Sequence, residues 1–145
     1  MGEEMKKILI TVDGSDNSRR ALIEAKKYAN LSDTEITLLT VVKPLISEYY
    51  DNIELPKLND PDELKKAGRS IIVNGKKIIG KSANKIVGKI RRGDPADEIL
   101  DEAKQYDYDL IIMGSRGLGV FSRSFLGSVS HKILNHVETD VLIIK

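Results

Sequence analysis

The hydrophobic positions of this chain fall into two alternating patterns, short apolar runs and longer stretches with a helical period. The short runs are rich in β-branched residues and apolar on both faces, as strands buried in a parallel sheet are. Alternation of this kind predicts one α/β domain over residues 1–145, with a doubly wound, mostly parallel sheet of five strands covered by helices on both faces. The predicted strands are Lys7–Val12, Glu35–Val42, Ala83–Ile90, Leu110–Met113 and Val141–Lys145.

The stretches with a helical period carry their own start signals. Ser15 or Asp16 can cap the first helix, and Asp60 and Asp94, each followed by proline, start the second and third. The fourth helix is predicted over Ser128–Val137. The positions predicted to face inward are Ala21, Leu22, Ala25, Tyr28 and Ala29, then Leu64, Ala67, Ile71, Ile72, Ile78 and Ile79, then Ile99, Leu100 and Ala103, and finally Val129, Ile133, Leu134 and Val137.

Two segments interrupt this regular pattern. Gly68 and Gly75 lie inside the second helix, and each is expected to weaken it by about 1 kcal/mol. Pro44–Asp60 is a long connection that we expect to be exposed.

Composition and charge exclude several classes of function. The net charge of +1 gives no overall attraction to nucleic acid or to an anionic membrane, so neither partner is expected. The absence of cysteine excludes disulfides, thiolate catalysis and cysteine-based zinc sites, and two histidines are too few for a histidine-built metal site. No apolar stretch approaches the roughly 18 residues of a membrane span. We therefore expect a cytoplasmic protein.

Glycines follow the fourth predicted strand and lead into the last helix. Gly114-Ser115-Arg116-Gly117-Leu118-Gly119 begins where that strand ends, and Gly127-Ser128-Val129-Ser130 begins the helix. Glycines let a backbone approach a ligand, and the free N–H groups of a helix start favour a phosphate. The serine hydroxyls and Arg116 can add donors and charge. The alternative is a tight strand-to-helix connection with an exposed serine cap.

The first strand ends in a second polar segment, Thr11-Val12-Asp13-Gly14-Ser15. The first and fourth strands of a doubly wound sheet can be neighbours where the winding reverses, which would place Asp13 across a crevice from the glycines. A carboxylate there can accept from ribose hydroxyls or help to hold a metal. The alternative is that Asp13 and Ser15 only form the turn and cap the helix.

These segments resemble the universal stress protein family over nearly the whole chain. The similarity lies in the opening KILITVDGSDNS, the strand end LLTVV, the helix start GDPADEIL, the strand and loop LIIMGSRG and the final VLIIK. The ATP-binding subgroup of that family carries a Gly-x2-Gly-x9-Gly-(Ser/Thr) motif. Gly114, Gly117, Gly127 and Ser128 match it, with nine residues between Gly117 and Gly127.

The resemblance implies a fold like that of the adenine nucleotide alpha-hydrolases, strand order 3-2-1-4-5, and ATP bound at the switch point with Mg²⁺ or Mn²⁺. The metal would be held mainly by the phosphates, with Asp13 as the one protein candidate. It also implies a homodimer formed through Val141–Lys145. The implied nucleotide-binding residues are Thr11, Val12, Asp13 and Val41 at the adenosine end, Met113, Gly114, Arg116 and Gly117 along the nucleotide, and Gly127, Ser128, Val129 and Ser130 at the phosphates.

Three functions follow from these features. The leading hypothesis is a nucleotide-dependent regulatory protein of the stress response that hydrolyses ATP slowly or not at all, because no base other than Asp13 is evident. The second is an ATP-hydrolysing or adenylating enzyme, for which no catalytic residue is assigned. The third is a nucleotide-free dimeric interaction module.

A basic run and an acidic pair complete the candidate features. Lys65 to Arg92 contains ten Lys or Arg residues and no acid. A solvated helix face is favoured over a patch for an acidic partner or nucleic acid, since no aromatic residue is interleaved for base stacking. Asp107 and Asp109 precede the fourth strand, at the wrong end of a parallel sheet for a ligand.

Overall fold

The computed structural model describes residues 6–29, 33–44, 60–80, 85–116 and 126–145. Its strands form one parallel sheet in the order β3-β2-β1-β4-β5, which confirms the predicted order. The strands are β1 (Lys6–Thr11), β2 (Thr34–Val42), β3 (Lys85–Arg92), β4 (Leu110–Gly114) and β5 (Asp140–Ile144). The helices are α1 (Asp16–Ala29), α2 (Pro61–Ile79), α3 (Pro95–Gln105) and α4 (Ser128–His136).

The ends of some elements differ from the prediction by a residue or two. Val12 lies just beyond β1, α4 ends one residue before Val137, and β5 ends one residue before Lys145. Ala83 and nearly all of the Pro44–Asp60 connection lie outside the described residues.

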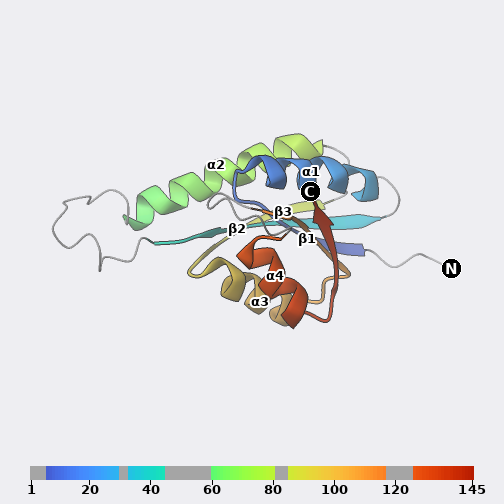
Figure 1. Cartoon of the computed structure of the whole chain (residues 1–145). Helices are drawn as coiled ribbons and strands as arrows, with labels where there is room; N and C mark the ends of the chain where they lie inside the picture. The colour runs from blue at the N-terminus through green and yellow to red at the C-terminus, as the bar shows by residue number, and fades with distance from the viewer. Residues whose placement is uncertain (1–5, 30–32, 45–59, 81–84, 117–125) are drawn as a thin grey trace.

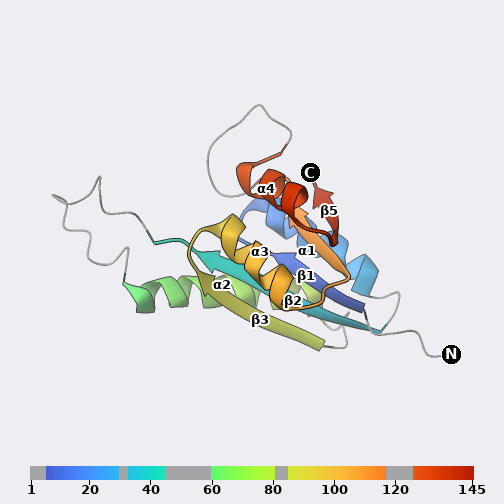
Figure 2. The same cartoon turned by 90° about the horizontal axis from the view of Figure 1, so that it is seen from below.

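The sheet is the middle of three layers. Helices α1 and α2 cover one face and α3 and α4 cover the other (Figure 1). Strand β1 lies between β2 and β4, and the edges of the sheet are β3 and β5 (Figure 2). Because the helices that follow β1 and β4 lie on opposite faces, the winding reverses between these two strands.

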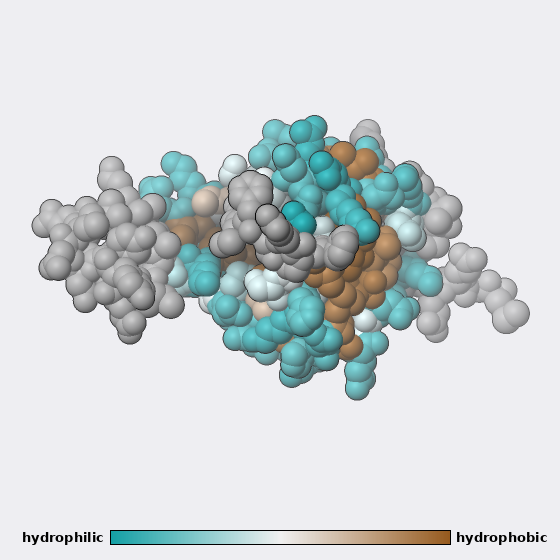
Figure 3. All heavy atoms as spheres, in the orientation of Figure 1, coloured by the Kyte–Doolittle hydropathy of each residue, from teal (hydrophilic) through white to brown (hydrophobic). Residues whose placement is uncertain are grey.

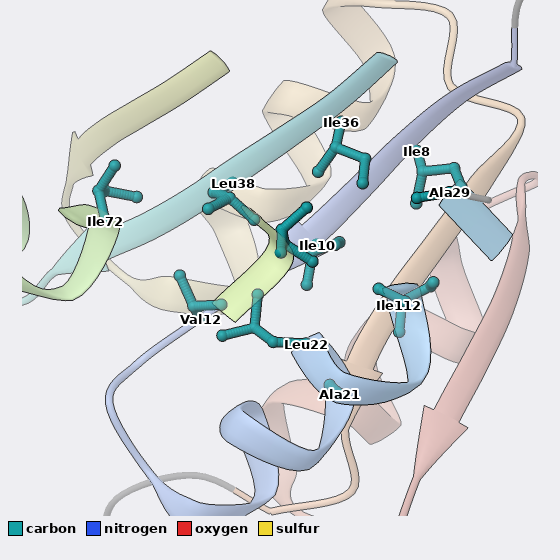
Figure 4. Packing of buried hydrophobic residues seen from close by; sticks show 12 residues of the cluster. Ile8, Ile10, Val12, Ala21, Leu22, Ala29, Ile36, Leu38, Ile72 and Ile112 are labelled. Atoms are coloured by element: carbon teal, nitrogen blue, oxygen red, sulfur yellow. The ribbon is translucent and has the colours of Figure 1, made fainter. Parts of the chain in front are cut away.

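Alternate residues of the strands fill two separate cores. Ile8 and Ile10 of β1 point toward α1 and α2 and belong to one cluster that includes Leu22 of α1 and Ile72 of α2 (Figure 4). Leu9 points to the opposite face and packs with residues of α3 and α4. This period of two, with both faces buried, is why the middle of β1 and most of β4 are apolar at consecutive positions.

The predicted helix starts are confirmed by their hydrogen bonds. The Asp60 carboxylate accepts from the N–H of Asp62 at 3.0 Å, and the Asp94 carboxylate accepts from the N–H of Asp97 at 3.1 Å. Ser15 Oγ accepts from the N–H of Ser18 at 3.2 Å, so Ser15 is the cap of α1.

Two glycines bring α2 onto the sheet instead of breaking it. The helix runs without interruption through Gly68 and Gly75, and both are buried. A methyl group added to Gly68 would lie 3.1 Å from Ile90, and one added to Gly75 would lie 3.0 Å from Leu38. These glycines lower the helix propensity of α2, as expected, but they also let α2 lie close to the sheet. A larger side chain at either position would prevent that close packing.

Three predicted inward positions are wrong. Ala67 is exposed because α2 turns its glycines, Ile72 and Ile79 toward the sheet. Tyr28 is 38% exposed because the stripe that α1 buries consists of smaller side chains such as Ala21 and Ala25. Leu134 is 41% exposed, since α4 buries the neighbouring Ile133 in its place.

The described helices include none with the length and apolar character that crossing a membrane requires.

Candidate functional site

The ends of β1 and β4 meet at one edge of the sheet. Ile8 pairs with Leu110 and Ile10 with Ile112, so the segments that follow each strand leave the sheet side by side. The structure thus brings Thr11, Val12 and Asp13 together with Met113 and Gly114 at the reversal of winding. In open α/β sheets, ligands bind in the crevice at this position.

Beyond β1 the chain makes a tight turn built on Asp13. Its Oδ1 accepts from the N–H of Ser15 at 2.9 Å, and Gly14 takes a φ of 84°. This φ lies in the left-handed region that favours glycine. The half-buried Asp13 carboxylate therefore stabilises the turn that leads into α1, as the alternative interpretation of the sequence held.

The end of β4 makes a close contact with α1. A methyl group added to Gly114 would lie 2.8 Å from Asn17 Cβ and 2.9 Å from the Asn17 carbonyl carbon. The Asn17 side chain donates to Ser115 Oγ at 3.3 Å. Gly114 is needed here for the approach of the protein's own helix, whereas the sequence had suggested the approach of a ligand.

Ser115 ties the glycine segment to two other elements. Its N–H donates to the carbonyl of Ile144 in β5 at 2.7 Å. Its carbonyl accepts from the N–H of Gly127 at 2.6 Å and from Ser130 Oγ at 2.9 Å. These bonds bring residues 115 and 127 together and fix the start of α4 at the end of β4.

The start of α4 differs from the other described helix starts in its charge. The helices α1, α2 and α3 have a side-chain cap and an acidic residue in the first turn. Gly127 provides no side-chain cap to α4, and the first turn of α4 contains no acid. The first N–H groups of a helix lack partners within it and carry about half a positive charge. The start of α4 is therefore a site that favours an anion.

The serines at this helix start have different surroundings. Ser128 is exposed, and its hydroxyl can reach a ligand. Ser130 is 2% exposed, and its hydroxyl donates to Ser115 as described. Through its hydroxyl Ser130 therefore holds the segment in shape, and only its backbone N–H belongs to the anion-favouring end of the helix.

The remaining predicted residues surround this centre. Val12 and Met113 are buried, and Thr11 is half-buried. Val41 lies near the carboxyl end of β2 and packs on the α3 side of the sheet. Val129 is partly buried against the same cluster. Arg116 is exposed, and Gly117 lies outside the described residues.

The described residues show no preformed metal site. No group of three or more His, Asp or Glu side chains among them could hold a metal ion. Asp13 contributes one carboxylate at the carboxyl end of β1, and its Oδ1 already accepts from the N–H of Ser15. A metal bound here would depend on ligand phosphates for most of its coordination.

The opposite end of the sheet carries polar features with structural roles. Asp109 accepts from the backbone N–H of Lys7 at 2.8 Å, which joins the starts of β1 and β4. Asp107, Tyr106 and Tyr108 line a surface pocket of about 440 Å³ together with His136. Asp109 thus joins two strands at the end of the sheet where no ligand was expected.

Glu102 is a buried glutamate that the sequence did not identify. Glu102 is 1% exposed and accepts from Lys89 at 2.8 Å and from Tyr108 at 2.6 Å, with Arg91 Nε at 3.4 Å. Burial and the hydrogen bond to Glu102 raise the pKa of Tyr108 above its usual value. In the sequence, Glu102 is one of several acids on a helix, and only the positions of the β3 cations reveal its partners.

Comparisons with known proteins agree with this fold. The model of the universal stress protein family matches residues 4–145. Universal stress protein YxiE of Bacillus subtilis is 32% identical, with 96% of this chain and 98% of that protein covered. The structure of UspA from Lactobacillus plantarum superposes with a TM-score of 0.82 at 26% identity, covering 99% of this chain and 100% of that one.

Some structures of the same fold contain adenine nucleotides. A universal stress protein from Archaeoglobus fulgidus was solved with dAMP (TM-score 0.71, 22% identity, 97% of this chain and 98% of that one). An Arabidopsis thaliana member was solved with AMP (TM-score 0.65, 24% identity, 97% of this chain and 91% of that one). At these identities the likeness establishes the fold alone. The match of the family model over nearly the whole chain shows that this protein belongs to the universal stress protein family.

Proposed function

We propose that this protein binds ATP, with Mg²⁺ or Mn²⁺, and acts as a nucleotide-dependent regulatory protein of the stress response. The observation that carries the proposal is the start of α4, which has neither a side-chain cap nor an acid and lies at the winding reversal. The glycine spacing of Gly114, Gly117, Gly127 and Ser128 supports the same ligand. Adenine nucleotides in structures of related proteins support it further.

In this proposal the backbone N–H groups of Ser128, Val129 and Ser130 bind the phosphates. Ser128 Oγ adds a donor, and Arg116 adds positive charge. The adenosine lies toward Thr11, Val12, Asp13 and Val41. Met113 and Gly114, with Gly117 outside the described residues, are the positions that the sequence predicts to run along the nucleotide. The metal would be held mainly by phosphate oxygens, with Asp13 nearby.

Bound ATP would act as a switch ligand and would be hydrolysed slowly, if at all. Hydrolysis needs a base that positions or activates water. Asp13 is the acid that the sequence offers as a base, and one of its carboxylate oxygens already accepts from the N–H of Ser15. A protein of this kind would work in the cytoplasm.

We also propose that the protein is a homodimer paired through β5. This strand forms one edge of the sheet, and an apolar edge left unpaired is a liability. Its residues Val141, Leu142, Ile143 and Ile144 are only half-buried. An apolar area is visible where β5 lies in the view of Figure 3.

The nucleotide proposal is tested by a substitution that prevents the close packing of Gly127 against Ser115. A methyl group at this position would already lie 3.2 Å from the Ser115 carbonyl oxygen, so Gly127→Val should displace the start of α4. We expect calorimetry to show binding of Mg-ATP to the wild type and none to a folded Gly127→Val dimer. Retention of binding in that folded variant would mean that the phosphates lie elsewhere.

The nucleotide that the cell supplies can be identified directly. Purified protein is denatured, and the released small molecules are separated by chromatography and identified by mass. We expect ATP or another adenine nucleotide. Steady release of ADP or AMP by the purified protein would instead support the enzyme alternative, and binding of no nucleotide would support the interaction module.

A further inference from the structure

The long basic run of the sequence divides into two groups in the structure. Lys89 and Arg91 of β3 point toward α3, where Glu98 and Glu102 neutralise them at 2.8–3.4 Å. Lys85 shares that face of β3 and lies 4.0 Å from the Glu35 carboxylate. The remaining described cations of the run lie on α2 or, in the case of Arg92, on the opposite face of β3. Six of these are exposed: Lys65, Lys66, Arg69, Lys76 and Lys77 of α2, and Arg92 of β3. We call these six residues the basic face.

The cations of α2 lie on one side of that helix. At about 100° per residue, the five from Lys65 to Lys77 fall within a sector of about 120°. They extend over about 18 Å of helix axis. The two acids of α2, Asp62 and Glu63, are confined to its first turn. The basic face is therefore a continuous stripe of one sign.

Strand β3 places Arg92 at the end of this stripe. Ile72 of α2 packs on Gly88 of β3, and Gly68 of α2 lies beside Ile90 of β3. Moving two residues forward along β3 therefore moves the facing position four residues toward the start of α2. Gly88, Ile90 and Arg92 share one face of the strand. Continuing the same step places Arg92 beside Leu64, the residue that precedes Lys65 in α2.

Nothing in the described part of the chain neutralises the basic face. The ion pairs and side-chain hydrogen bonds of the described residues do not include any of its six side chains. The like charges of the basic face repel one another. The protein as a whole has a net charge of only +1, so this excess of positive charge is confined to one part of the surface. Such a patch is typical of a surface that meets a complementary charge.

We propose that the basic face binds an acidic segment of another protein. Val73 of α2 lies within the sector and is 50% exposed, which offers one apolar contact amid the cations. A protein segment can use that contact, whereas a phosphate backbone cannot. The proposal is independent of the nucleotide site.

Other polyanions fit the surface less well. The described exposed residues of α2 include no aromatic side chain on which bases could stack. The apolar side of α2 is buried against the sheet through Ile72 and Ile79, so it has no free apolar face to insert into a membrane. A short acidic segment matches a stripe of about 18 Å, whereas nucleic acids and membranes are extended charges.

Fluorescence anisotropy with four probes tests the proposal. Two labelled peptides of equal negative charge are used, one of glutamate alone and one with a single leucine at its centre. A 20-base-pair DNA duplex and phosphatidylserine vesicles represent the other classes. At about 50 mM salt, where screening is weak, we expect both peptides to bind, the leucine peptide about threefold more tightly.

The variants assign the binding to this surface. Lys65→Gln, Arg69→Gln and Lys76→Gln together should weaken peptide binding at least about tenfold. The matched control removes three exposed lysines elsewhere, with Lys7→Gln, Lys43→Gln and Lys104→Gln, and should change it less than about twofold. Val73→Ser should abolish the preference for the leucine peptide. Thermal unfolding confirms that all variants are folded.

Three results would overturn the proposal. One is equal loss of peptide binding in the two triple variants, which would make the effect one of net charge. Another is tighter binding of the duplex or the vesicles than of either peptide, which would assign the surface to a different class of partner. The third is the absence of peptide binding to the wild type.

Discussion

Single residues at the crevice show how one amino acid can serve the fold and the site together. Gly114 was predicted to admit a nucleotide, and the structure shows that it first admits Asn17 of α1. The sequence motif identifies the glycine but not the neighbour, because Asn17 is 97 positions away in the chain. The same holds for Ser115 and Ser130, whose hydrogen bond closes the segment.

We predict that Gly114→Ala destabilises the protein even without nucleotide. The added methyl group would lie 2.9 Å from the Asn17 backbone, so the first turn of α1 must move. Overpacking of this kind costs about 1–3 kcal/mol. Urea unfolding of the nucleotide-free protein measures it. An unchanged free energy of unfolding would show that Gly114 serves only a ligand.

Glu102 gives a second prediction at this scale. Glu102→Gln should lower the free energy of unfolding by about 3 kcal/mol or more, because it removes the partner of Lys89 and Arg91 from a buried site. Glu98→Gln is the matched control, since Glu98 is 26% exposed and its loss should cost about 1 kcal/mol or less. Chemical denaturation of both variants measures the difference. Equal losses would mean that burial of Glu102 adds nothing.

Tyr108 predicts a dependence of stability on pH. Burial and its bond to Glu102 raise the pKa of Tyr108, so the folded protein holds this proton more tightly than the unfolded chain. Its contribution is complete below the unfolded pKa of about 10 and is lost as pH rises through the folded value. Denaturation at several pH values above about 10 should show a smaller decline in Tyr108→Phe than in the wild type.

Among the elements, the strands and the capped helices were the most predictable. Asp60 and Asp94 identify their helices from sequence because a cap is a local interaction between neighbouring residues. The rotation of α2 was not predictable to the same degree. It depends on how Gly68 and Gly75 meet Ile90 and Leu38, which are residues of two other elements.

Helix α4 yields a prediction in which stability and binding change in opposite directions. Ser128→Asp places an acid at the uncapped, acid-free start of the helix. It should stabilise the nucleotide-free protein by about 0.3–1 kcal/mol through the helix dipole. It should also weaken ATP binding, because the carboxylate would repel the phosphates. Thermal unfolding and calorimetry measure the two effects.

Ser128→Asn is the control for this variant, because it has the same size without the charge. It should bind ATP within a few-fold of the wild type. Equal weakening by Asn and Asp would assign the effect to shape and not to charge, and the anion site at α4 would then lose its main support.

For the whole molecule, the sheet order was predictable and the assembly stays a prediction. The family resemblance indicated the order that the structure confirms. No partner chain could be placed from the sequence, because pairing at an edge depends on a surface shared by two copies.

The β5 dimer can be tested with one proline. The carbonyl of Ile144 accepts from Ser115, the residue that follows β4. The backbone groups of every second residue, including Leu142, therefore point toward β4, and those of Val141 point outward. Val141→Pro removes only an outward N–H, which an edge strand tolerates. Analytical ultracentrifugation should show a folded monomer for this variant and a dimer for Val141→Ala. A variant that stays dimeric would place the interface on another surface.

The central claim is that the start of α4 holds the phosphates of an adenine nucleotide, and a titration series tests it most directly. Adenosine, AMP and Mg-ATP are each titrated into the nucleotide-free protein by calorimetry. The account predicts that affinity rises with the number of phosphates, with Mg-ATP bound at micromolar concentration, about −8 kcal/mol. Binding of adenosine as tightly as Mg-ATP, or of neither, would contradict it.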